Sequence, residues 1–274
     1  MRPLSNGKGH GWRRGLPDPV NDWKLSRRLG ALQATPENPS LNPRFFPSIR
    51  DQGQLGSCTG HGLRSALAYK LRERLGEKLE GKWGKDWDLS PLAMYWLGRA
   101  EEGPEWTKID AGAIILEVVK AARKHGIPTE ESWPYIESKF KTKPSERALK
   151  TGRWHQASPA SYRCDEDGDR SKTVDRMLQA LAAGLPVVKG FPCYANLSEA
   201  DSDGILRPPR GAMEGGHCTP IYWADTQARI FWGPNSWGPW GGKGPDGKRG
   251  YIGTPFQWVL DGLVDDAHAI ELEE

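Results

Sequence analysis

The sequence predicts an α+β fold in which a helical first half is followed by a β-rich second half. Three stretches before residue 126 carry apolar residues at spacings of three and four, the period of one buried helix face. Short runs of β-branched and aromatic residues, bounded by glycine, proline or aspartate, gather after residue 185. A chain that segregates helices from strands in this way is typical of the α+β class.

The three predicted helices have recognisable ends. The first covers residues 58–75 and begins at Cys58, directly after a glycine-rich loop. The second begins at Pro91, with Ser90 as its N-cap. The third covers residues 114–124 and is closed by Gly126. Together they predict a helical lobe over about 58–140.

The second half contains four predicted strand segments, at residues 186–191, 219–223, 228–232 and 250–252. They predict an antiparallel, β-rich lobe over about 180–260. A further helical period covers 174–183 and ends at Gly184. Residues 137–171 are charged and have no clear period, so we assign them to the crossing between the lobes and to surface excursions.

The 274 residues are enough for one two-lobed domain with a real core, to which 13 tryptophans contribute. Residues 1–40 carry seven basic and three acidic side chains, whereas the remainder is close to neutral. A basic arm can contact nucleic acid or membranes, but no nucleic-acid motif accompanies this one. We therefore expect a solvated tail or a strap over an acidic patch of the same domain, and no nucleic-acid partner.

The first thirty residues lack an apolar run long enough for a signal peptide, and no segment reaches the roughly 18 apolar residues of a membrane helix. We therefore expect a soluble, cytoplasmic chain without a membrane span. Export by a route without a cleaved signal stays open, and so does the oligomeric state.

Cys58 lies where the loop Gln52-Gly53-Gln54-Leu55-Gly56-Ser57 meets the first helix. At a helix N-terminus the macrodipole and the unpaired backbone N–H groups stabilise a thiolate, which lowers a thiol pKa that is otherwise about 8.5. The position therefore predicts a nucleophile at neutral pH. Such a nucleophile needs a base, a group that orients the base, and donors for an oxyanion.

Three segments, in this order, resemble the papain-like (C1) cysteine peptidases: the loop from Gln52 to Cys58, then Gly215-Gly216-His217-Cys218, then Gly233-Pro234-Asn235-Ser236-Trp237-Gly238. The resemblance extends from about Phe46 to Asp261. It implies a papain-like two-lobed domain over residues 46–274 with the active-site cleft between the lobes.

The resemblance also implies a role for each site residue. Cys58 is the nucleophile, and His217 is the base that later acts as the acid. Asn235 orients the imidazole, and Trp237 shields that hydrogen bond from water. Gln52 donates its side-chain N–H to the oxyanion, together with the backbone N–H of Cys58.

Three further residues are implied to bind substrate. Gly112 and Ala113 precede the third helix, where the family lines its cleft and pairs with an extended substrate backbone. The same residues also suit a plain N-cap turn with Asp110 as the cap, and the sequence does not decide between the two. Cys218 is implied to line a pocket for a substrate side chain.

Residues 1–45 are an N-terminal arm or a short strap similar to a pro-segment. Related peptidases often carry a pro-segment of about a domain's length, but only some fifty residues precede Gln52. We expect a permanent brace, with a cleavable strap across the cleft as the alternative.

The chain departs from its relatives at Leu55, where secreted members usually carry a disulfide cysteine. If Cys58 is catalytic, Cys164, Cys193 and Cys218 remain as an odd set, which favours a reducing compartment. Thr59, Gly216 and Cys218 also depart from the family pattern, so substrate preference does not transfer from relatives.

The resemblance therefore implies an endopeptidase that acts on proteins or peptides through a thioester, without a metal or organic cofactor. The alternatives are another acyl transfer on the same groups (leader-peptide or isopeptide cleavage, deamidation, transglutamination) or an inactive binding module. A tetrahedral metal site of Cys58, His61, His217 and Cys218 is disfavoured, because it would leave Gln52 and Asn235 without a role.

Overall fold

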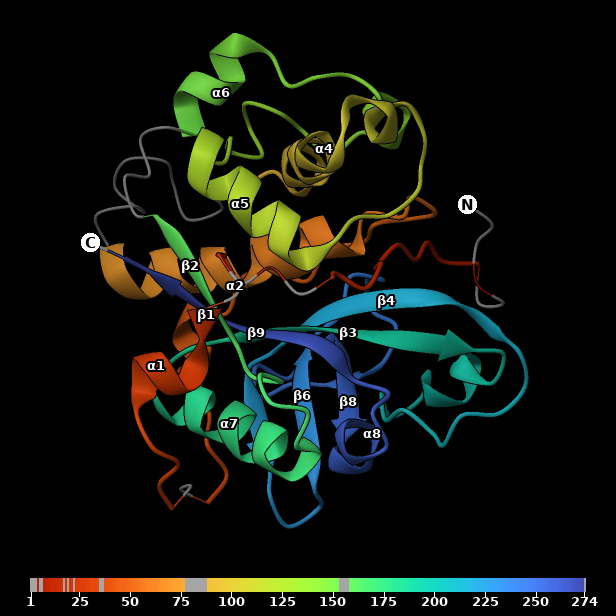
Figure 1. Cartoon of the computed structure of the whole chain (residues 1–274). Helices are drawn as coiled ribbons and strands as arrows, with labels where there is room; N and C mark the ends of the chain where they lie inside the picture. Colours follow the sequence, from red (N-terminus) through yellow and green to blue (C-terminus); the bar gives the residue numbers. More distant parts are fainter. Residues whose placement is uncertain are drawn as a thin grey trace.

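The computed structural model describes residues 4, 7–16, 18, 20–21, 23–34, 37–76, 88–152 and 158–273. Its helices and strands form two lobes, and the helical lobe lies above the sheets in Figure 1. The predicted α+β, two-lobed fold is therefore confirmed.

The helical lobe is built on the three predicted helices, α2 (Cys58–Leu75), α4 (Pro91–Glu102) and α5 (Ile115–His125). Ser90 caps α4 by accepting a hydrogen bond from the Ala93 N–H at 3.1 Å, as predicted. Short helices complete this lobe: η2 (Pro104–Lys108), η3 (Glu137–Lys139) and α6 (Glu146–Gly152). The last two lie in the stretch that the sequence left without a period.

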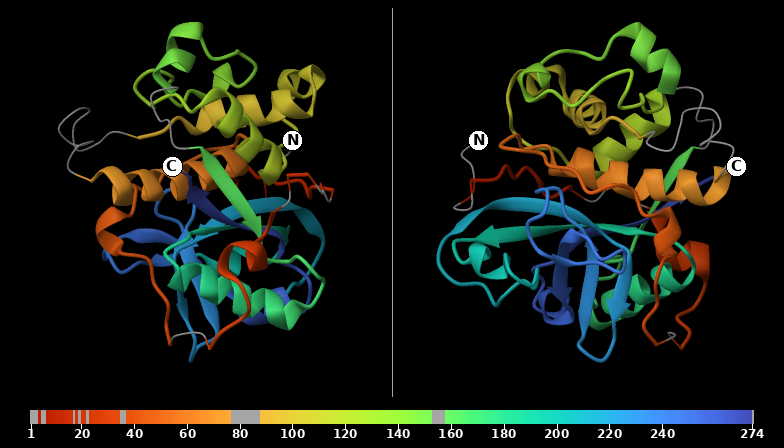
Figure 2. Two further views of the ribbon diagram at one scale, coloured as in Figure 1. Left: turned by 60° about the vertical axis from the view of Figure 1, so that its left-hand side comes forward. Right: turned by 180° about the vertical axis from the view of Figure 1, so that it is seen from behind.

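Helix α2 lies at the boundary between the lobes, with α4 and α5 on one side and strands of the β-rich lobe on the other (Figures 1 and 2). Every residue from Cys58 to Tyr69 is buried. Cys58 therefore starts a helix that is covered on both sides, which places the thiol between the lobes.

The β-rich lobe holds two sheets. Their orders are β1-β2-β9-β3-β4 and β5-β6-β8-β7, and all pairs are antiparallel except β1 with β2. The strands are β1 (Trp23–Lys24), β2 (Pro159–Arg163), β3 (Val187–Tyr194), β4 (Met213–Ile221), β5 (Trp223–Asp225), β6 (Ile230–Pro234), β7 (Gly242–Lys243), β8 (Arg249–Pro255) and β9 (Asp265–Leu272). Helices α1 (Leu25–Leu29), α7 (Arg170–Ala182) and α8 (Phe256–Leu260) and the short η1 (Pro43–Phe45) and η4 (Leu197–Ala200) flank them.

Three strands of the first sheet, β1, β2 and β9, lie outside the predicted strand segments and outside residues 180–260. Strand β9 occupies the centre of the sheet although it begins Asp265-Asp266-Ala267-His268. Acidic residues are depleted in strands, so this sequence gave no strand signal. The strand forms because ion pairs and hydrogen bonds satisfy its buried polar side chains.

His217 lies in the middle of β4 and not at the start of a strand, because the pairing with β3 extends back through Gly216 and Gly215. Asn235 follows β6, as predicted, and its backbone N–H donates to the Gly250 carbonyl at 2.8 Å. Strands β4 and β6 belong to different sheets but pack against each other, which brings both residues to the boundary with α2.

The basic N-terminal arm pairs with acidic groups of its own domain. Ion pairs join Lys8 to Asp51 at 2.7 Å, Arg14 to Asp265 at 3.1 Å and Arg28 to Glu271 at 2.6 Å. Arg13 pairs with Glu102. The arm is therefore a strap. None of the helices in the described part of the chain is long and apolar enough to cross a membrane.

Candidate active site

The structure brings His217 and Asn235 into direct contact. The imidazole Nε2 donates to Asn235 Oδ1 over 2.8 Å, and Trp237 stacks on the imidazole with ring centroids 4.1 Å apart and planes 20° apart. All three side chains are buried. The geometry is that of an oriented imidazole whose hydrogen bond is shielded from water.

The other imidazole nitrogen, His217 Nδ1, has no hydrogen-bond partner among the described residues. Cys58 lies close by, because its sulfur accepts a hydrogen bond from the backbone of Cys218, the next residue along β4. A buried nitrogen without a partner, beside a thiol, is placed to take up a proton.

Gln52 is fully buried and held at both ends of its side chain. Its Nε2 donates to the Leu55 carbonyl at 2.8 Å, and its Oε1 accepts from Ser236 Oγ at 2.5 Å. An amide nitrogen carries two hydrogens, so one remains for a further acceptor. The predicted role as oxyanion donor uses that second hydrogen and stays a prediction.

An N-terminal segment, Gly9 to Arg13, covers the site. Ala113 N–H donates to Gly11 O at 2.8 Å, and Arg13 N–H donates back to Ala113 O at 3.1 Å. On the opposite wall, the N–H groups of Gly11 and Trp12 donate to Gly216 O at 2.8 and 2.9 Å. The segment, red in Figure 1, therefore bridges both lobes.

The same segment also reaches the Cys58 loop and the tryptophan that covers His217. Gly9 N–H donates to Gly53 O at 2.8 Å, and the Trp237 indole donates to Gly9 O at 3.2 Å. The cleft is closed by the chain's own backbone.

Two glycines make this close approach feasible. A Cβ on Gly9 would lie 2.3 Å from Leu55 O, and a Cβ on Gly11 would lie 1.9 Å from Gly56 O. Side chains at these positions would collide with the backbone of the loop that carries Cys58. The Gly-His-Gly spacing was a signal of close backbone approach that our sequence reasoning did not use.

The structure separates the two roles considered for Gly112 and Ala113. Ala113 pairs with the N-terminal segment in an extended, strand-like way, as the resemblance implied for a substrate backbone. Asp110 is not a helix cap: it accepts hydrogen bonds from Tyr95 OH and Gly56 N–H, whereas the N-cap of α5 is Ile114. The N-cap alternative is therefore wrong, because the helix starts later than Asp110 could reach.

The expected thiolate is not present in this closed state. Burial raises the pKa of Cys58 to about 12 and lowers the pKa of His217 to about 3. The thiol does lie at the start of α2, but the cost of desolvating a charge exceeds the benefit of the helix N-terminus. The covered site therefore holds a neutral thiol beside a neutral imidazole.

All four cysteines are free and buried. The Cys218 thiol packs against α2, 3.0 Å from the position of a Cβ on Gly62. His61 packs edge-on against Tyr135, with ring centroids 4.8 Å apart. Among the described residues, no group of three histidine, cysteine or acidic side chains is arranged to hold a metal ion.

The sequence did not identify Trp12, Gly190 or Asp266 as residues of the site. The Trp12 indole lies over Gly190 of β3 and Gly216 of β4. Its Nε1 donates to the buried carboxylate of Asp266 at 3.3 Å. No local pattern connects positions so far apart in the chain, and only the fold brings them together.

Comparison with known proteins supports the geometry. No family model matches the sequence. An uncharacterised peptidase C1-like protein of Acanthamoeba polyphaga mimivirus is 29% identical over 219 residues, which are 77% of this chain and 65% of that protein. The chain thus spans just under two thirds of the length of that relative.

Solved structures share the fold across nearly the whole chain. Xylellain, a cysteine protease from Xylella fastidiosa, superposes with a TM-score of 0.77 at 24% identity, over 100% of this chain and 98% of its own. A procathepsin B of Trypanosoma congolense gives 0.64 at 14% identity, over 98% of this chain and 88% of its own. The resemblance to papain-like cysteine peptidases and the papain-like fold are therefore confirmed.

Proposed function

We propose that this chain, on its papain-like fold, is a cysteine endopeptidase that is held closed by its own N-terminal segment. The observation that carries the proposal is the shielded His217–Asn235 pair, whose Nδ1 is left without a partner beside the thiol at the start of α2. An imidazole oriented in this way serves as the base for a thiol nucleophile.

The reaction begins when the segment leaves the cleft and a substrate takes its place. Cys58 transfers its proton to His217 Nδ1, and the thiolate attacks the carbonyl carbon of the scissile bond. The oxyanion is stabilised by the second Nε2 hydrogen of Gln52 and the backbone N–H of Cys58. His217 then gives the proton to the leaving amine, and a thioester remains on Cys58.

Water completes the cycle. His217 removes a proton from the water as it attacks the thioester carbonyl, the acid product is released, and the thiol is regenerated with the proton from His217. Asn235 holds the imidazole plane through both steps, and Trp237 keeps water away from their hydrogen bond.

The segment itself covers the nucleophile. The backbone of Gly11 and Trp12 lies beside the Cys58 sulfur. The N–H groups of both residues donate to Gly216 O at 2.8 and 2.9 Å, which fixes this part of the segment across the cleft. This arrangement supports a strap that blocks access of a substrate to Cys58.

We also infer that the enzyme works in a reducing, cytoplasmic environment. Leu55 removes the usual disulfide partner near the nucleophile, and the four thiols are unpaired. A nucleophilic thiol with two other cysteines close to it in the fold is best protected where disulfides are kept reduced.

The test uses the full chain with Trp12→Ala, which weakens the segment, and the same chain with Cys58→Ala added. Iodoacetamide labelling located by mass spectrometry and hydrolysis of a peptide library are measured on both. We expect labelling of Cys58 and split peptides for the first chain only. Equal hydrolysis by both chains would refute the proposal, and a mass gain of one unit without splitting would indicate deamidation instead.

A further inference from the structure

The Trp12 side chain fills a pocket beside the nucleophile, and its contacts define the shape of that pocket. A Cβ on Gly190 would lie 1.9 Å from Trp12 Cε2 and 2.2 Å from its Nε1, and a Cβ on Gly216 would lie 2.8 Å from Cε3. The indole therefore lies directly on the backbone of two adjacent strands. Any side chain at Gly190 would exclude it.

A carboxylate closes the far end of this pocket. Asp266 Oδ2 accepts hydrogen bonds from Trp12 Nε1 at 3.3 Å and from Gly15 N–H at 3.4 Å. Trp12 belongs to the N-terminal segment, and Gly15 follows that segment in the same arm, so both donors lie within residues 9–15. Asp266 is 1% exposed, so little water reaches it while the segment is in place.

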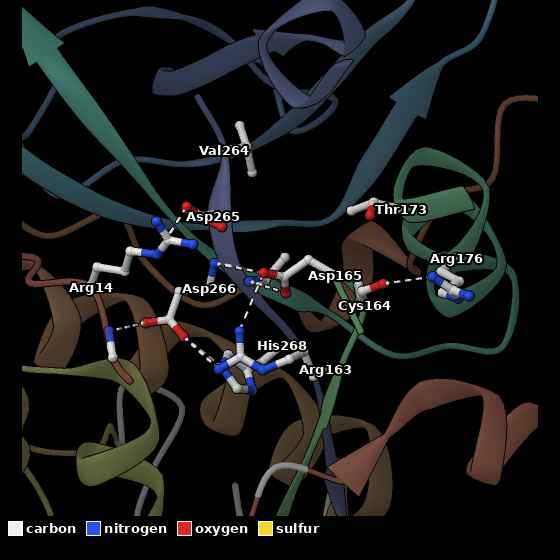
Figure 3. A network of polar contacts seen from close by, with 12 residues as sticks. Arg14, Arg163, Cys164, Asp165, Thr173, Arg176, Val264, Asp265, Asp266 and His268 are labelled. Atoms are coloured by element: carbon white, nitrogen blue, oxygen red, sulfur yellow. Dashed lines mark hydrogen bonds and ion pairs between the residues drawn. The ribbon is translucent and has the colours of Figure 1, made fainter. Parts of the chain in front are cut away.

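The other oxygen of the same carboxylate is held by the domain. Asp266 Oδ1 accepts from Arg163 at 3.1 Å and from His268 at 3.0 Å (Figure 3). Asp165 accepts from the Asp266 backbone N–H at 3.2 Å and pairs with the same arginine. Asp266 has a φ of 55°, so this network fixes a conformation that few residues adopt and keeps Oδ2 directed at the pocket.

When the segment leaves, Oδ2 loses both donors while Oδ1 keeps its own. A carboxylate oxygen in a mostly buried pocket without a donor is costly, and a ligand that supplies one removes that cost. The pocket thus requires two features of its occupant: a flat group that fits over Gly190 and a polar hydrogen at its end.

We propose that this pocket selects substrates by a large planar aromatic side chain with an N–H or O–H donor, tryptophan above all, and that Gly190 and Asp266 determine the selection. The inference rests on the proposed function, in that residues 9–15 leave the cleft and a substrate peptide takes their place. Trp12 is then a mimic of the substrate side chain, supplied by the chain itself.

Two other occupants fit less well. A phenylalanine fills the space over Gly190 but leaves Oδ2 without a donor. An arginine supplies donors, and its charge is not excluded, because Arg163 is shared between Asp165 and Asp266. Its flexible aliphatic chain, however, lacks the flat face that fits over Gly190 and loses rotamer freedom on binding, so a rigid aromatic donor is favoured.

Binding is measured on the full chain that carries Trp12→Ala and Cys58→Ala, so that the pocket is open and nothing is cut. The probes are fluorescent peptides that differ at one residue, which is tryptophan, tyrosine, phenylalanine, leucine, alanine or arginine. We expect tryptophan to bind about tenfold more tightly than phenylalanine, since a hydrogen bond to a charged acceptor is involved. Equal or tighter binding of leucine or arginine would overturn the proposal.

Adding Gly190→Ala tests the floor of the pocket. The new methyl group occupies the place of the indole, so tryptophan and tyrosine should lose at least about tenfold in affinity. The alanine peptide serves as the internal control and should keep its affinity, because it does not reach the floor. A uniform loss for all peptides, or no loss for tryptophan, would contradict the assignment.

Adding Asp266→Asn instead tests the polar end. Asparagine keeps the size and tolerates a positive φ, but its oxygen is neutral. The preference for tryptophan over phenylalanine should fall to about threefold or less, with phenylalanine binding unchanged, because charged acceptors make the stronger bonds. An unchanged ratio in a variant with unaltered near-UV circular dichroism would remove Asp266 from the proposal.

Hydrolysis of the same peptides by Trp12→Ala with Cys58 intact separates the pocket from the proposed activity. Tryptophan-selective binding without hydrolysis would support the assigned pocket and refute the proposed peptidase activity. Hydrolysis that depends on Cys58 but ignores the aromatic residue keeps the peptidase and overturns the pocket.

Discussion

Two glycine-spaced segments meet at Cys58, and they are held in different ways. The loop 52–57 is fixed by buried side chains: Gln52 bonds to Ser236, and Tyr135 bonds to both Gln52 O and Ser57 Oγ. The segment 9–13 is held mainly by backbone hydrogen bonds to Gly53, Ala113 and Gly216. The first is part of the permanent site, whereas the second can leave without breaking the core.

The ion pairs around the segment support this difference. Lys8 and Asp51 are 27% and 45% exposed in their side chains, and Arg14 is 68% exposed. Exposed pairs contribute about 0–1 kcal/mol each. Among the side chains of the segment, the Trp12 indole in its pocket is therefore the main anchor. The comparison predicts large effects at the loop and graded effects along the segment.

The largest effect is expected at the loop. In a full chain opened by Trp12→Ala, Gln52→Ala should lower kcat by about 10²–10³-fold, because an oxyanion donor is lost. The rate of Cys58 alkylation should change by no more than a few fold, since the thiol and His217 are unchanged. Steady-state kinetics and iodoacetamide labelling of the same samples distinguish a loss of oxyanion stabilisation from a loss of thiol reactivity. A parallel loss of labelling would show that Gln52 acts through the loop's structure.

The next effect is expected at the anchor of the segment. Trp12→Ala removes a large, partly buried side chain, which costs the closed state about 2–3 kcal/mol and raises the open fraction some 30- to 100-fold. The rate of Cys58 alkylation at pH 7.5 should rise by the same factor. Trp23→Ala is the matched control, because Trp23 lies in β1 and packs against Tyr162.

Gly11→Ala tests whether the backbone of the segment keeps the cleft closed. The added methyl group would lie 1.9 Å from Gly56 O, so it should release the segment while leaving the pocket residues intact. Protection of Cys58 that survives both Gly11→Ala and Trp12→Ala would mean that something other than the segment buries the thiol.

The sequence predicted what local signals encode. The cap at Ser90, the stop at Gly126 and the start of α2 at Cys58 all depend on residues within a few positions, and all agree with the structure. The His217–Asn235 contact followed from a resemblance. Strand β9 escaped prediction because Arg163 and Asp165, which are remote in sequence, stabilise its buried Asp266.

The ionisation of the site escaped prediction for a related reason. A helix N-terminus lowers the pKa of an exposed thiol, but residues more than forty positions upstream cover Cys58 and remove it from water. The same distance hid the pocket, since Trp12, Gly190 and Asp266 carry no common motif. Local sequence determines which groups are present, and the long-range contacts determine their chemistry.

A pH dependence follows from the covered site. His217 resists protonation in the closed state down to a pKa of about 3, partly because of nearby Lys189 and His10. Its pKa is lowered, so the closed state is favoured above about pH 6.5 and loses stability as the pH falls from there toward 3. Cys58, whose pKa is raised to about 12 by burial, favours the closed state until the pH exceeds the pKa of the open-state thiol, which the helix N-terminus lowers below about 8.5.

Opening should therefore be least above about pH 6.5 and below the open-state pKa of Cys58, and it should increase by at most tenfold per pH unit for each group outside that range. Hydrogen exchange of the Gly11 and Trp12 amides, corrected for intrinsic rates, measures the open fraction. Cys58→Ala is an informative control, because it should abolish the alkaline increase and keep the acid one. A flat profile in the unmodified chain would show that opening does not expose these two groups.

The smallest effect is expected at the exposed ion pair of the segment. Arg14→Ala removes the pair with Asp265, and because Arg14 is mostly exposed the loss should be below about 1 kcal/mol, or less than fivefold in the alkylation rate. The effect should vanish at high salt, where surface charges are screened. Arg13→Ala should exceed it, because Arg13 is 29% exposed, pairs with a buried Glu102 and lies 4.2 Å over the Trp106 ring. If the two variants opened the cleft equally, charge would contribute more than packing to the binding of the segment. The contrast between a fixed loop and a strap anchored by Trp12 would then be wrong.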